Sequence, residues 1–213
     1  MDKKLDIIEI FTSVQGETSY TGLPTTFIRL ARCNLRCSWC DTPYGFKRGA
    51  AMDFASIRAQ IAAPYVCITG GEPLLQPGVF ELMKVLCDEG YRLSIETGGS
   101  LDTAAIDTRV KTILDIKCPG SGMADRNLWS NLEQLRPQDE VKFVIADRAD
   151  YDYAVAVCER HGLYDRVAEL LFAPVFGQLE AKQLVAWILE DRLPVRLNLQ
   201  THKFIWSPDT KGV

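Results

Sequence analysis

The sequence has no long apolar run, only two histidines and no excess of positive charge. No stretch approaches the roughly 20 consecutive apolar residues that a membrane-spanning helix needs. The first ten residues lack the apolar core of a secretory signal. The net charge of −4 over 213 residues gives no sign of broad attraction to nucleic acid or anionic lipid. We therefore expect a cytoplasmic protein that binds neither nucleic acid nor a membrane.

The composition is that of an ordinary globular protein. Apolar residues make up 47% of the chain and charged residues 24%, which excludes a disordered chain, a collagen-like fibre and a coiled coil. No linker, low-complexity tract or internal repeat interrupts the sequence. We therefore expect one domain that spans residues 1–213.

Short apolar runs alternate with amphipathic stretches along the chain. The patterns predict strands at 27–30, 65–69, 93–96, 112–116, 141–145, 167–172 and 195–199, and helices at 54–62, 80–86, 128–135, 151–161 and 181–189. Strand and helix alternate about six times, which is typical of parallel βα units. A complete eight-unit barrel takes about 250 residues. The sequence therefore predicts an α/β fold, an incomplete (βα)6-type parallel barrel.

Three of the predicted strands end in polar or glycine residues. These ends are Thr69–Glu72, Glu96–Gly99 and Asp115–Lys117. The C-terminal ends of parallel barrel strands meet on one face, where active sites of such folds lie. We expect these three ends to line a single polar cavity.

Seven cysteines in a reducing compartment are not expected to form a disulfide framework. Cys33, Cys37 and Cys40 have the spacing C-x3-C-x2-C and directly follow the first predicted strand. A closed zinc site takes four protein ligands, and no fourth Cys or His is near in the sequence. An iron–sulfur cluster held by three cysteines keeps one iron open to a ligand. A zinc or redox-sensing binding module remains a distant alternative. The other four thiols are expected to be packed in the core or to be bystanders: Cys67, Cys87, Cys118 and Cys158.

The cysteine motif, followed by Gly70-Gly71-Glu72-Pro73, resembles the radical S-adenosylmethionine superfamily. The segments Gln15-Gly16-Glu17, Cys40-Asp41-Thr42 and Thr201-His202-Lys203 resemble, more narrowly, the 7-carboxy-7-deazaguanine synthase family. This likeness extends from the N-terminus to about Lys203. The segment from Asp115 to Gly120 also resembles the activases of glycyl-radical enzymes, which are the alternative function.

The resemblance implies two cofactors and a metal ion. Cys33, Cys37 and Cys40 would hold a 4Fe–4S cluster whose open iron binds S-adenosyl-L-methionine, and reductive cleavage of that cofactor would give a 5′-deoxyadenosyl radical. Thr42 would contribute a hydroxyl to Mg²⁺. The residues expected to bind S-adenosyl-L-methionine are Gly70, Gly71, Glu72, Glu96, Thr97, Gly98, Asp115 and Lys117.

The resemblance also implies the substrate and the partners. The substrate would be 6-carboxy-5,6,7,8-tetrahydropterin, which undergoes ring contraction with loss of ammonia. Gln15 and Glu17 would read its amino-pyrimidine edge, and Arg29 would hold its carboxylate. The whole set expected to bind substrate is Gln15, Gly16, Glu17, Arg29, Thr69 and His202. An electron donor such as flavodoxin or ferredoxin and a homodimeric assembly are expected as well.

Overall fold

A single open sheet organises the protein. The structure, a computed structural model, describes residues 4–213. Nine strands are hydrogen-bonded in the order β3-β1-β2-β4-β5-β6-β7-β8-β9. Their bounds are β1 Lys4–Val14, β2 Pro24–Leu30, β3 Ala50–Asp53, β4 Tyr65–Gly70, β5 Arg92–Thr97, β6 Lys111–Ile116, β7 Glu140–Ile145, β8 Glu169–Pro174 and β9 Arg196–Leu197. The helices are α1 Phe54–Arg58, α2 Gly78–Asp88, α3 Arg148–His161, α4 Ala181–Glu190 and α5 His202–Ile205.

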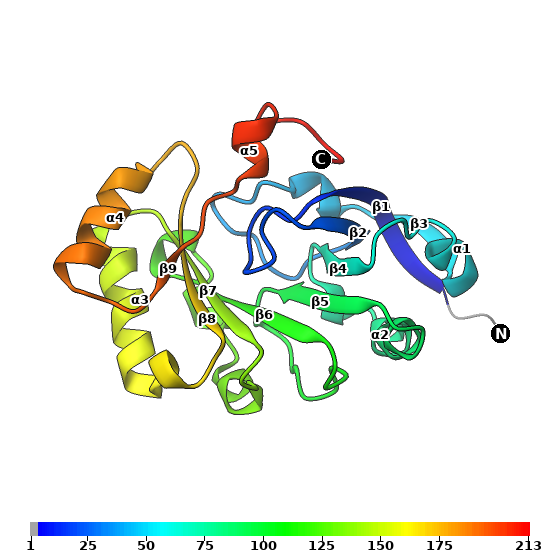
Figure 1. Ribbon diagram of the computed structural model, residues 1–213, viewed down its shortest axis with the longest axis horizontal. Coiled ribbons are helices and arrows are strands. Elements are labelled where there is room, and N and C mark those ends of the chain that lie inside the picture. Colours follow the sequence, from blue (N-terminus) through cyan, green and yellow to red (C-terminus); the bar gives the residue numbers. More distant parts are fainter. Residues whose placement is uncertain (1–3) are drawn as a thin grey trace.

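The seven strands β2 and β4 to β9 are all parallel, whereas β1 is antiparallel to both β2 and β3. The sheet curves around a central space, with α2, α3 and α4 on its outer side (Figure 1). Strands β3 and β9 form the two edges and do not pair with each other. The prediction of an incomplete parallel barrel is therefore confirmed.

The core lies between the sheet and the outer helices. Helix α2 buries Val79, Leu82, Met83 and Leu86, which recur at helical spacing, in a cluster with residues of β1, β2, β4 and β5. Helices α3 and α4 pack against β6, β7 and β8 in a second cluster. Because the two apolar clusters pack on the outer face of the sheet, polar side chains can lie on its inner face.

The β1–β2 turn, residues 15–23, crosses to the start of β6 and β7. The Ser19 hydroxyl bonds to the carboxylate of Glu140, and Lys111 Nζ lies 2.7 Å from the same carboxylate. Lys111 also lies over the ring of Tyr20, 4.6 Å from its centroid. Glu140 and Lys111 are the first residues of their strands. The tip of the turn thus lies at the N-terminal ends of these strands, opposite the ends that carry the polar residues.

Several elements differ from the sequence prediction. Strands β1 and β3 and helix α5 were not predicted, the helix expected at 54–62 ends at Arg58, and the strand expected at 195–199 is limited to Arg196–Leu197. The helix expected at 128–135 is a 3-10 helix, Trp129–Gln134. Within it, the Asn131 amide bonds to Thr103 N and to the carbonyls of Gly99 and Leu101. The side chain therefore secures the neighbouring β5–β6 loop. No helix in residues 4–213 has the length and apolarity that a membrane span requires.

Candidate active site

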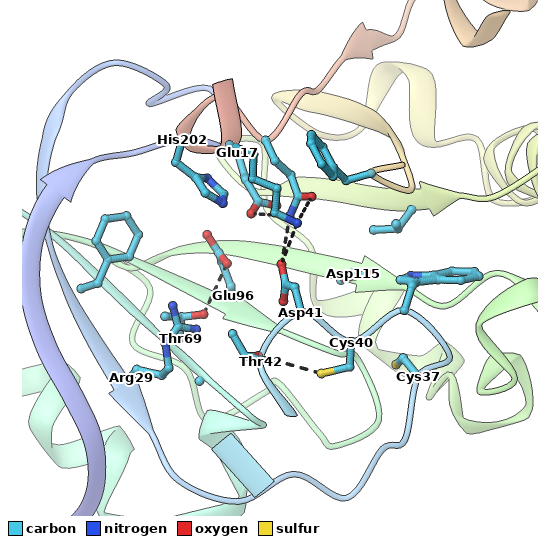
Figure 2. Close-up of a pocket in the computed structure, with 18 of the residues that line it drawn as sticks. Glu17, Arg29, Cys37, Cys40, Asp41, Thr42, Thr69, Glu96, Asp115 and His202 are labelled. Carbon is cyan, nitrogen blue, oxygen red and sulfur yellow. Dashed lines mark hydrogen bonds and ion pairs between the residues drawn. The ribbon is translucent and has the colours of Figure 1, made fainter. Parts of the chain in front are cut away.

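A polar cavity of about 790 Å³ opens at the C-terminal ends of the parallel strands. Five neighbouring strands each direct a polar side chain into it, because alternate residues of a strand face the same side of the sheet. These side chains are Arg29 from β2, Thr69 from β4, Glu96 from β5, Asp115 from β6 and Lys142 from β7. Figure 2 shows the labelled residues around this space. The single cavity expected at these strand ends is confirmed. All but one of the predicted site residues line it: Gln15, Gly16, Glu17, Arg29, Cys33, Cys37, Cys40, Thr42, Thr69, Gly70, Gly71, Glu96, Thr97, Gly98, Asp115, Lys117 and His202.

The three motif cysteines are free thiols that line the cavity together. Each is partly exposed, and burial raises the pKa of the Cys33 and Cys37 thiols. A bound metal must displace these protons, because the thiolate is the ligand. Within residues 4–213, no three Cys, His, Asp or Glu side chains converge on a point that would hold one metal ion. A four-iron cluster takes each thiolate on a separate iron, and three thiols that line one cavity fit such a cluster.

Gly71 lets the strand end pack on the chain that leads into the cysteine loop. A Cβ at Gly71 would lie 2.0 Å from the carbonyl oxygen of Arg32 and 2.9 Å from Cys33 Cβ. Gly70 has φ +145°, and a Cβ there would lie 2.2 Å from the carbonyl oxygen of Leu30. These glycines therefore fix the cysteine loop against β4, in addition to lining the cavity.

Glu72 is the predicted site residue that does not line the cavity. It is fully buried, and its carboxylate accepts hydrogen bonds from the Thr97 hydroxyl, the Gly98 amide and the Leu74 amide at 2.8–3.0 Å. Burial raises its pKa. Its carboxylate thus holds the end of β5 in place, and Thr97 and Gly98 form the wall that a ligand would meet.

Asp115 and Lys117 form an ion pair in the cavity wall, with 2.8 Å between Lys117 Nζ and Asp115 Oδ2. Burial opposes the charge of Lys117, but the attraction of Asp115 raises its pKa overall. The second oxygen, Asp115 Oδ1, is buried without a hydrogen-bond partner among the described residues. A buried acceptor of this kind is costly unless a donor meets it. Asp115 thus leaves an acceptor unpaired in the cavity wall, which fits the S-adenosyl-L-methionine site predicted for it.

The two most specific sequence segments, from opposite ends of the chain, lie against each other. The carbonyl of Gly16 accepts from Thr201 N at 3.1 Å, and Gln200 Nε2 donates to Glu17 Oε1 at 3.0 Å. A Cβ on Gly16 would lie 2.6 Å from His202 Nδ1, so only glycine leaves room for the imidazole. Glu17 and His202 therefore share one side of the cavity (Figure 2).

Lys142 lines the cavity but was not among the residues predicted from the sequence. Its ammonium lies 2.5 Å from Glu17 Oε2. Burial by itself would raise the pKa of Glu17, but Lys142, Gln200 and His202 together lower it to about 2. Glu17 and two further carboxylates of the cavity raise the pKa of Lys142 despite its burial. A charged residue inside the otherwise apolar run 141–145 was the signal that could have revealed it.

Arg29 is anchored from two sides. Its Nε donates to Glu9 Oε1 at 2.7 Å, and the hydroxyl of Tyr44 donates to the same oxygen at 2.9 Å. Burial opposes its charge, but Tyr44 and Glu9 raise its pKa overall. A guanidinium has five N–H donors, so one bond to Glu9 leaves donors for an anion in the cavity.

Glu96 lies with the residues predicted to bind substrate. Its carboxylate is within 3.4 Å of Gln15 Nε2 and of the Thr69 hydroxyl. Gln15 also accepts from the Gly16 and Glu17 amides, which fixes that turn. Burial raises the pKa of Glu96, whereas that of Glu17 is lowered. Two carboxylates of the cavity thus have pKa values that are pushed in opposite directions.

Oxygen donors stand at the rim beside the cysteines. Thr42 Oγ1 lies 3.9 Å from Cys40 Sγ. The neighbouring Asp41 accepts from Gln200 Nε2 at 3.0 Å and lies 3.7 Å from Lys203 Nζ (Figure 2). A hydroxyl and a carboxylate are ligand types that Mg²⁺ takes, with water or substrate oxygens for the remaining positions. The donor chemistry fits the predicted magnesium ion.

Comparison with known proteins agrees with this geometry. The model of the Radical SAM superfamily matches residues 27–120, which contain the three cysteines and the first four parallel strands. In fold, the chain is similar to QueE from Escherichia coli, with a TM-score of 0.74 and 24% identity over 92% of this chain and 93% of that one. SuiB from Streptococcus suis shares the fold more distantly, with a TM-score of 0.54 and 13% identity over 79% of this chain and 46% of that one.

Curated relatives are similar along nearly the whole sequence. The 7-carboxy-7-deazaguanine synthase of Koribacter versatilis is 45% identical over 98% of this chain and 100% of its own length. That of Chlorobaculum tepidum is 46% identical over 98% of this chain and 97% of its own length. Identity at this level over both full lengths decides the family. The chain belongs to the 7-carboxy-7-deazaguanine synthase family of radical S-adenosylmethionine enzymes.

Proposed function

We propose that this protein converts 6-carboxy-5,6,7,8-tetrahydropterin into 7-carboxy-7-deazaguanine with release of ammonia, in queuosine and 7-deazapurine biosynthesis. The net reaction breaks a carbon–nitrogen bond, so the enzyme is a lyase. The observation that carries the proposal is the meeting of Glu17 and His202 over the same cavity as the three cysteines. The names of the full-length relatives, which are synthases and not glycyl-radical activases, support it.

Cys33, Cys37 and Cys40 would hold a 4Fe–4S cluster, with S-adenosyl-L-methionine on the iron that has no thiolate. When bound, these groups supply one-electron radical chemistry that amino-acid side chains cannot perform. Asp115 Oδ1 offers an unused acceptor for a ribose hydroxyl, and Lys117 offers a cation for a carboxylate. Glu72 acts as a positioning residue because it holds the Gly98 amide and the Thr97 hydroxyl.

The substrate would lie between the two chain ends and β2. Glu17 remains ionised and accepts from the N–H groups of an amino-pyrimidine. Arg29 donates to the substrate carboxylate, a pairing that a guanidinium makes well. Burial lowers the pKa of His202, so its imidazole is neutral near pH 7 and carries one N–H donor and one acceptor. We assign Glu96 to the substrate side, because it bonds to Gln15 and Thr69.

Thr42 would contribute its hydroxyl to Mg²⁺, with the substrate carboxylate as a second ligand. Asp41 stands next to it and is held by Gln200. A divalent cation at this position would stabilise negative charge on the carboxylate during the rearrangement.

The decisive test is an anaerobic incubation with the tetrahydropterin, S-adenosyl-L-methionine, Mg²⁺ and a strong reductant, followed by mass analysis of the product. We expect 7-carboxy-7-deazaguanine and ammonia, and less product when Mg²⁺ is omitted. A Thr42→Val variant should lose the response to Mg²⁺ but keep its iron. An unchanged pterin in the presence of a reduced, fully loaded cluster would contradict the proposed function.

We also propose that the enzyme uses a protein electron donor and forms a homodimer. The outer edges of strands β3 and β9 are unpaired. Phe204 and Ile205 of α5 expose large apolar side chains, and the exposed Phe176 packs against Phe204. Light scattering of the loaded protein should give twice the mass of one chain. A monomer at micromolar concentration would contradict this assembly.

A further inference from the structure

A short turn follows the end of β6 that carries Asp115 and Lys117. We call residues 118–123 the β6 turn; it contains one turn of 3-10 helix. The buried hydroxyl of Ser121 donates to the carbonyl of Cys118 at 2.6 Å and accepts from the following methionine amide at 3.1 Å. Bonds within the turn therefore fix its shape.

The cysteine loop rests on the β6 turn. Ser38 donates twice to it, from N to the carbonyl of Ser121 and from Oγ to the carbonyl of Gly120, both at 3.1 Å. The amide of Arg36 donates to the sulfur of the turn's methionine at 3.3 Å. Arg36 and Ser38 are the two neighbours of Cys37 in the sequence. The backbone on both sides of this cysteine is thus held by the turn.

A buried carboxylate holds the β6 turn from its other side. Asp150, in the first turn of α3, is 1% exposed. Its Oδ1 accepts from Gly120 N at 2.8 Å, and its Oδ2 accepts from the amide of Ala146, directly after β7, at 3.1 Å. A Cβ at Gly120 would lie 2.6 Å from Asp150 Oδ2. Only glycine therefore allows the turn to approach the carboxylate this closely.

These bonds form a path from α3 to a cluster ligand. Asp150 binds Gly120 N, the carbonyl of Gly120 binds Ser38, and Ser38 directly follows Cys37. Water cannot easily replace the carboxylate, because the site is buried and an amide left without an acceptor there is costly. Groups that orient metal ligands from outside commonly change metal affinity or activity by about 10- to 100-fold when they are removed.

We propose that Asp150 is a positioning residue for the iron–sulfur cluster: it fixes the β6 turn and thereby sets the place of Cys37 relative to Lys117. Because Lys117 directly precedes the turn, a displaced turn would disturb both the thiolate and the cation expected to meet S-adenosyl-L-methionine. The inference rests on the proposed function in one respect, that Cys37 is a cluster ligand. It does not depend on the pterin.

Asp150 also lies at the start of α3, so its effect on the cluster must be separated from helix capping. The N-cap of α3 is Asp147, an exposed residue whose carboxylate accepts from Asp150 N at 3.0 Å. The variant Asp147→Ala removes one carboxylate and weakens the same helix end but leaves the contact with Gly120 in place. It is therefore the matched control for Asp150→Ala.

The first test measures how fast the full-length, reconstituted protein loses iron to an anaerobic chelator that absorbs when it binds iron. We expect the rate constant to rise by about 10-fold or more in Asp150→Ala and to stay within about 2-fold of wild type in Asp147→Ala. Asp150→Asn keeps one acceptor oxygen and should lie between wild type and Asp150→Ala. Guanidinium denaturation of the cluster-free proteins checks that each variant folds.

The variant Gly120→Ala tests the same contact from the turn and leaves every acidic side chain intact. Its methyl group would press on the carboxylate, so iron loss should accelerate as in Asp150→Ala. In Gly120→Ala/Asp150→Ala the methyl group has room. Its rate constant should therefore be smaller than the product of the two single effects predicts, since residues in contact are not independent.

The second readout is spectroscopic. Electron paramagnetic resonance of the reduced cluster should change as S-adenosyl-L-methionine binds the open iron. Asp150→Ala and Gly120→Ala should need about 10-fold more of it for half of that change, because Cys37 and Lys117 are no longer aligned. Asp147→Ala should titrate like wild type.

Wild-type iron retention and titration in Asp150→Ala would overturn the proposal. So would equally fast iron loss from Asp147→Ala, which would assign the effect to the helix cap, or a Gly120→Ala protein that behaves as wild type. Turnover of the pterin by the wild-type protein tests the proposed function separately. Failure of that assay, with iron loss still specific to the Asp150 and Gly120 variants, would reject the reaction and leave the positioning role in place.

Discussion

At the residue scale, the buried pair of Lys142 and Glu17 is the strongest electrostatic feature of the cavity. Two charges in such a place are tolerated because each compensates the other and hydrogen bonds satisfy the rest. Gln200 supplies one of these bonds to Glu17. The pair keeps Glu17 ionised, which is the state that an amino-pyrimidine edge requires. In the proposed function, Lys142 would act on the substrate through Glu17, as a positioning residue.

Replacing Lys142 with Met should destabilise the protein, because Glu17 would remain buried without its cation. We expect the free energy of unfolding to fall by about 3–5 kcal/mol, as for other broken buried pairs. Guanidinium denaturation of the cluster-free protein measures it. The double variant Glu17→Gln/Lys142→Met should recover part of the loss, since it leaves no unpaired charge. A single variant as stable as wild type would mean that the pair is solvated in solution.

The ligand role of the cysteines has a direct test. Cys37→Ala should abolish cluster assembly, with iron content near zero after anaerobic reconstitution, and turnover should be lost with it. Cys87→Ala, on α2 and away from the cavity, should keep wild-type iron and brown colour. Retention of iron and turnover by Cys37→Ala would refute the ligand assignment.

The sequence predicted most side chains of the site but not their partners. The motif residues were found because their spacing is specific, and they do line one cavity. Lys142 was missed because a single lysine in a strand has no motif. Glu72 was expected to face a ligand, yet its oxygens are occupied by Thr97 and Gly98. Such pairings depend on which strand ends meet, which spacing alone cannot give.

At the element scale, the prediction succeeded where hydrophobic period decides structure. Helices α2, α3 and α4 and the parallel strands follow their apolar patterns, since each packs one face in the core. The prediction failed where side-chain hydrogen bonds determine the local backbone structure. Asn131 secures the β5–β6 loop, so residues 129–134 form a 3-10 helix and not the predicted α-helix. Strand β1 was missed because a register shift between Ile7 and Glu9 breaks its alternation of apolar and polar residues.

The contact between the β1–β2 turn and α5 depends on the absence of a side chain at Gly16. Gly16→Ala would place a Cβ 2.6 Å from His202 Nδ1 and 3.3 Å from His202 N, so the imidazole must rotate or the C-terminal segment must shift. We expect a loss of about 1–3 kcal/mol in unfolding free energy, typical of overpacking, and faster proteolysis after residue 199.

The variant Gly16→Ala/His202→Ala serves as its control, because removal of the imidazole relieves the closest contact. Its stability should therefore exceed the value obtained by adding the two single effects. Additive losses would indicate that Gly16 and His202 do not touch in solution. Iron content should be unchanged in all three variants, since the cysteine loop is not altered.

At the scale of the whole molecule, side-chain contacts in the cavity connect parts of the open sheet that no strand pairing joins. Strand β3 and strand β9 stay apart, so no ladder of hydrogen bonds joins the first and last parts of the barrel. Glu17 provides the link instead. It follows β1, pairs with Lys142 in the middle of β7 and accepts from Gln200 near the C-terminus. Loss of the Glu17 carboxylate charge should therefore lower the free energy of unfolding of the entire protein.

This link predicts how the fold responds to acid. The pKa of Glu17 is lowered from 4.5 to about 2 in the folded protein, so between these values the unfolded chain binds more protons than the folded one. The contribution of Glu17 to stability is thus fully present above pH 4.5 and is lost as the pH falls towards 2. Urea denaturation should show a wild-type advantage over Glu17→Gln that is constant above pH 4.5 and shrinks below it. The Glu133→Gln change, which removes an exposed carboxylate, is the charge-matched control. An advantage over Glu17→Gln that persists undiminished in acid would mean that the carboxylate charge does not join the two ends of the sheet.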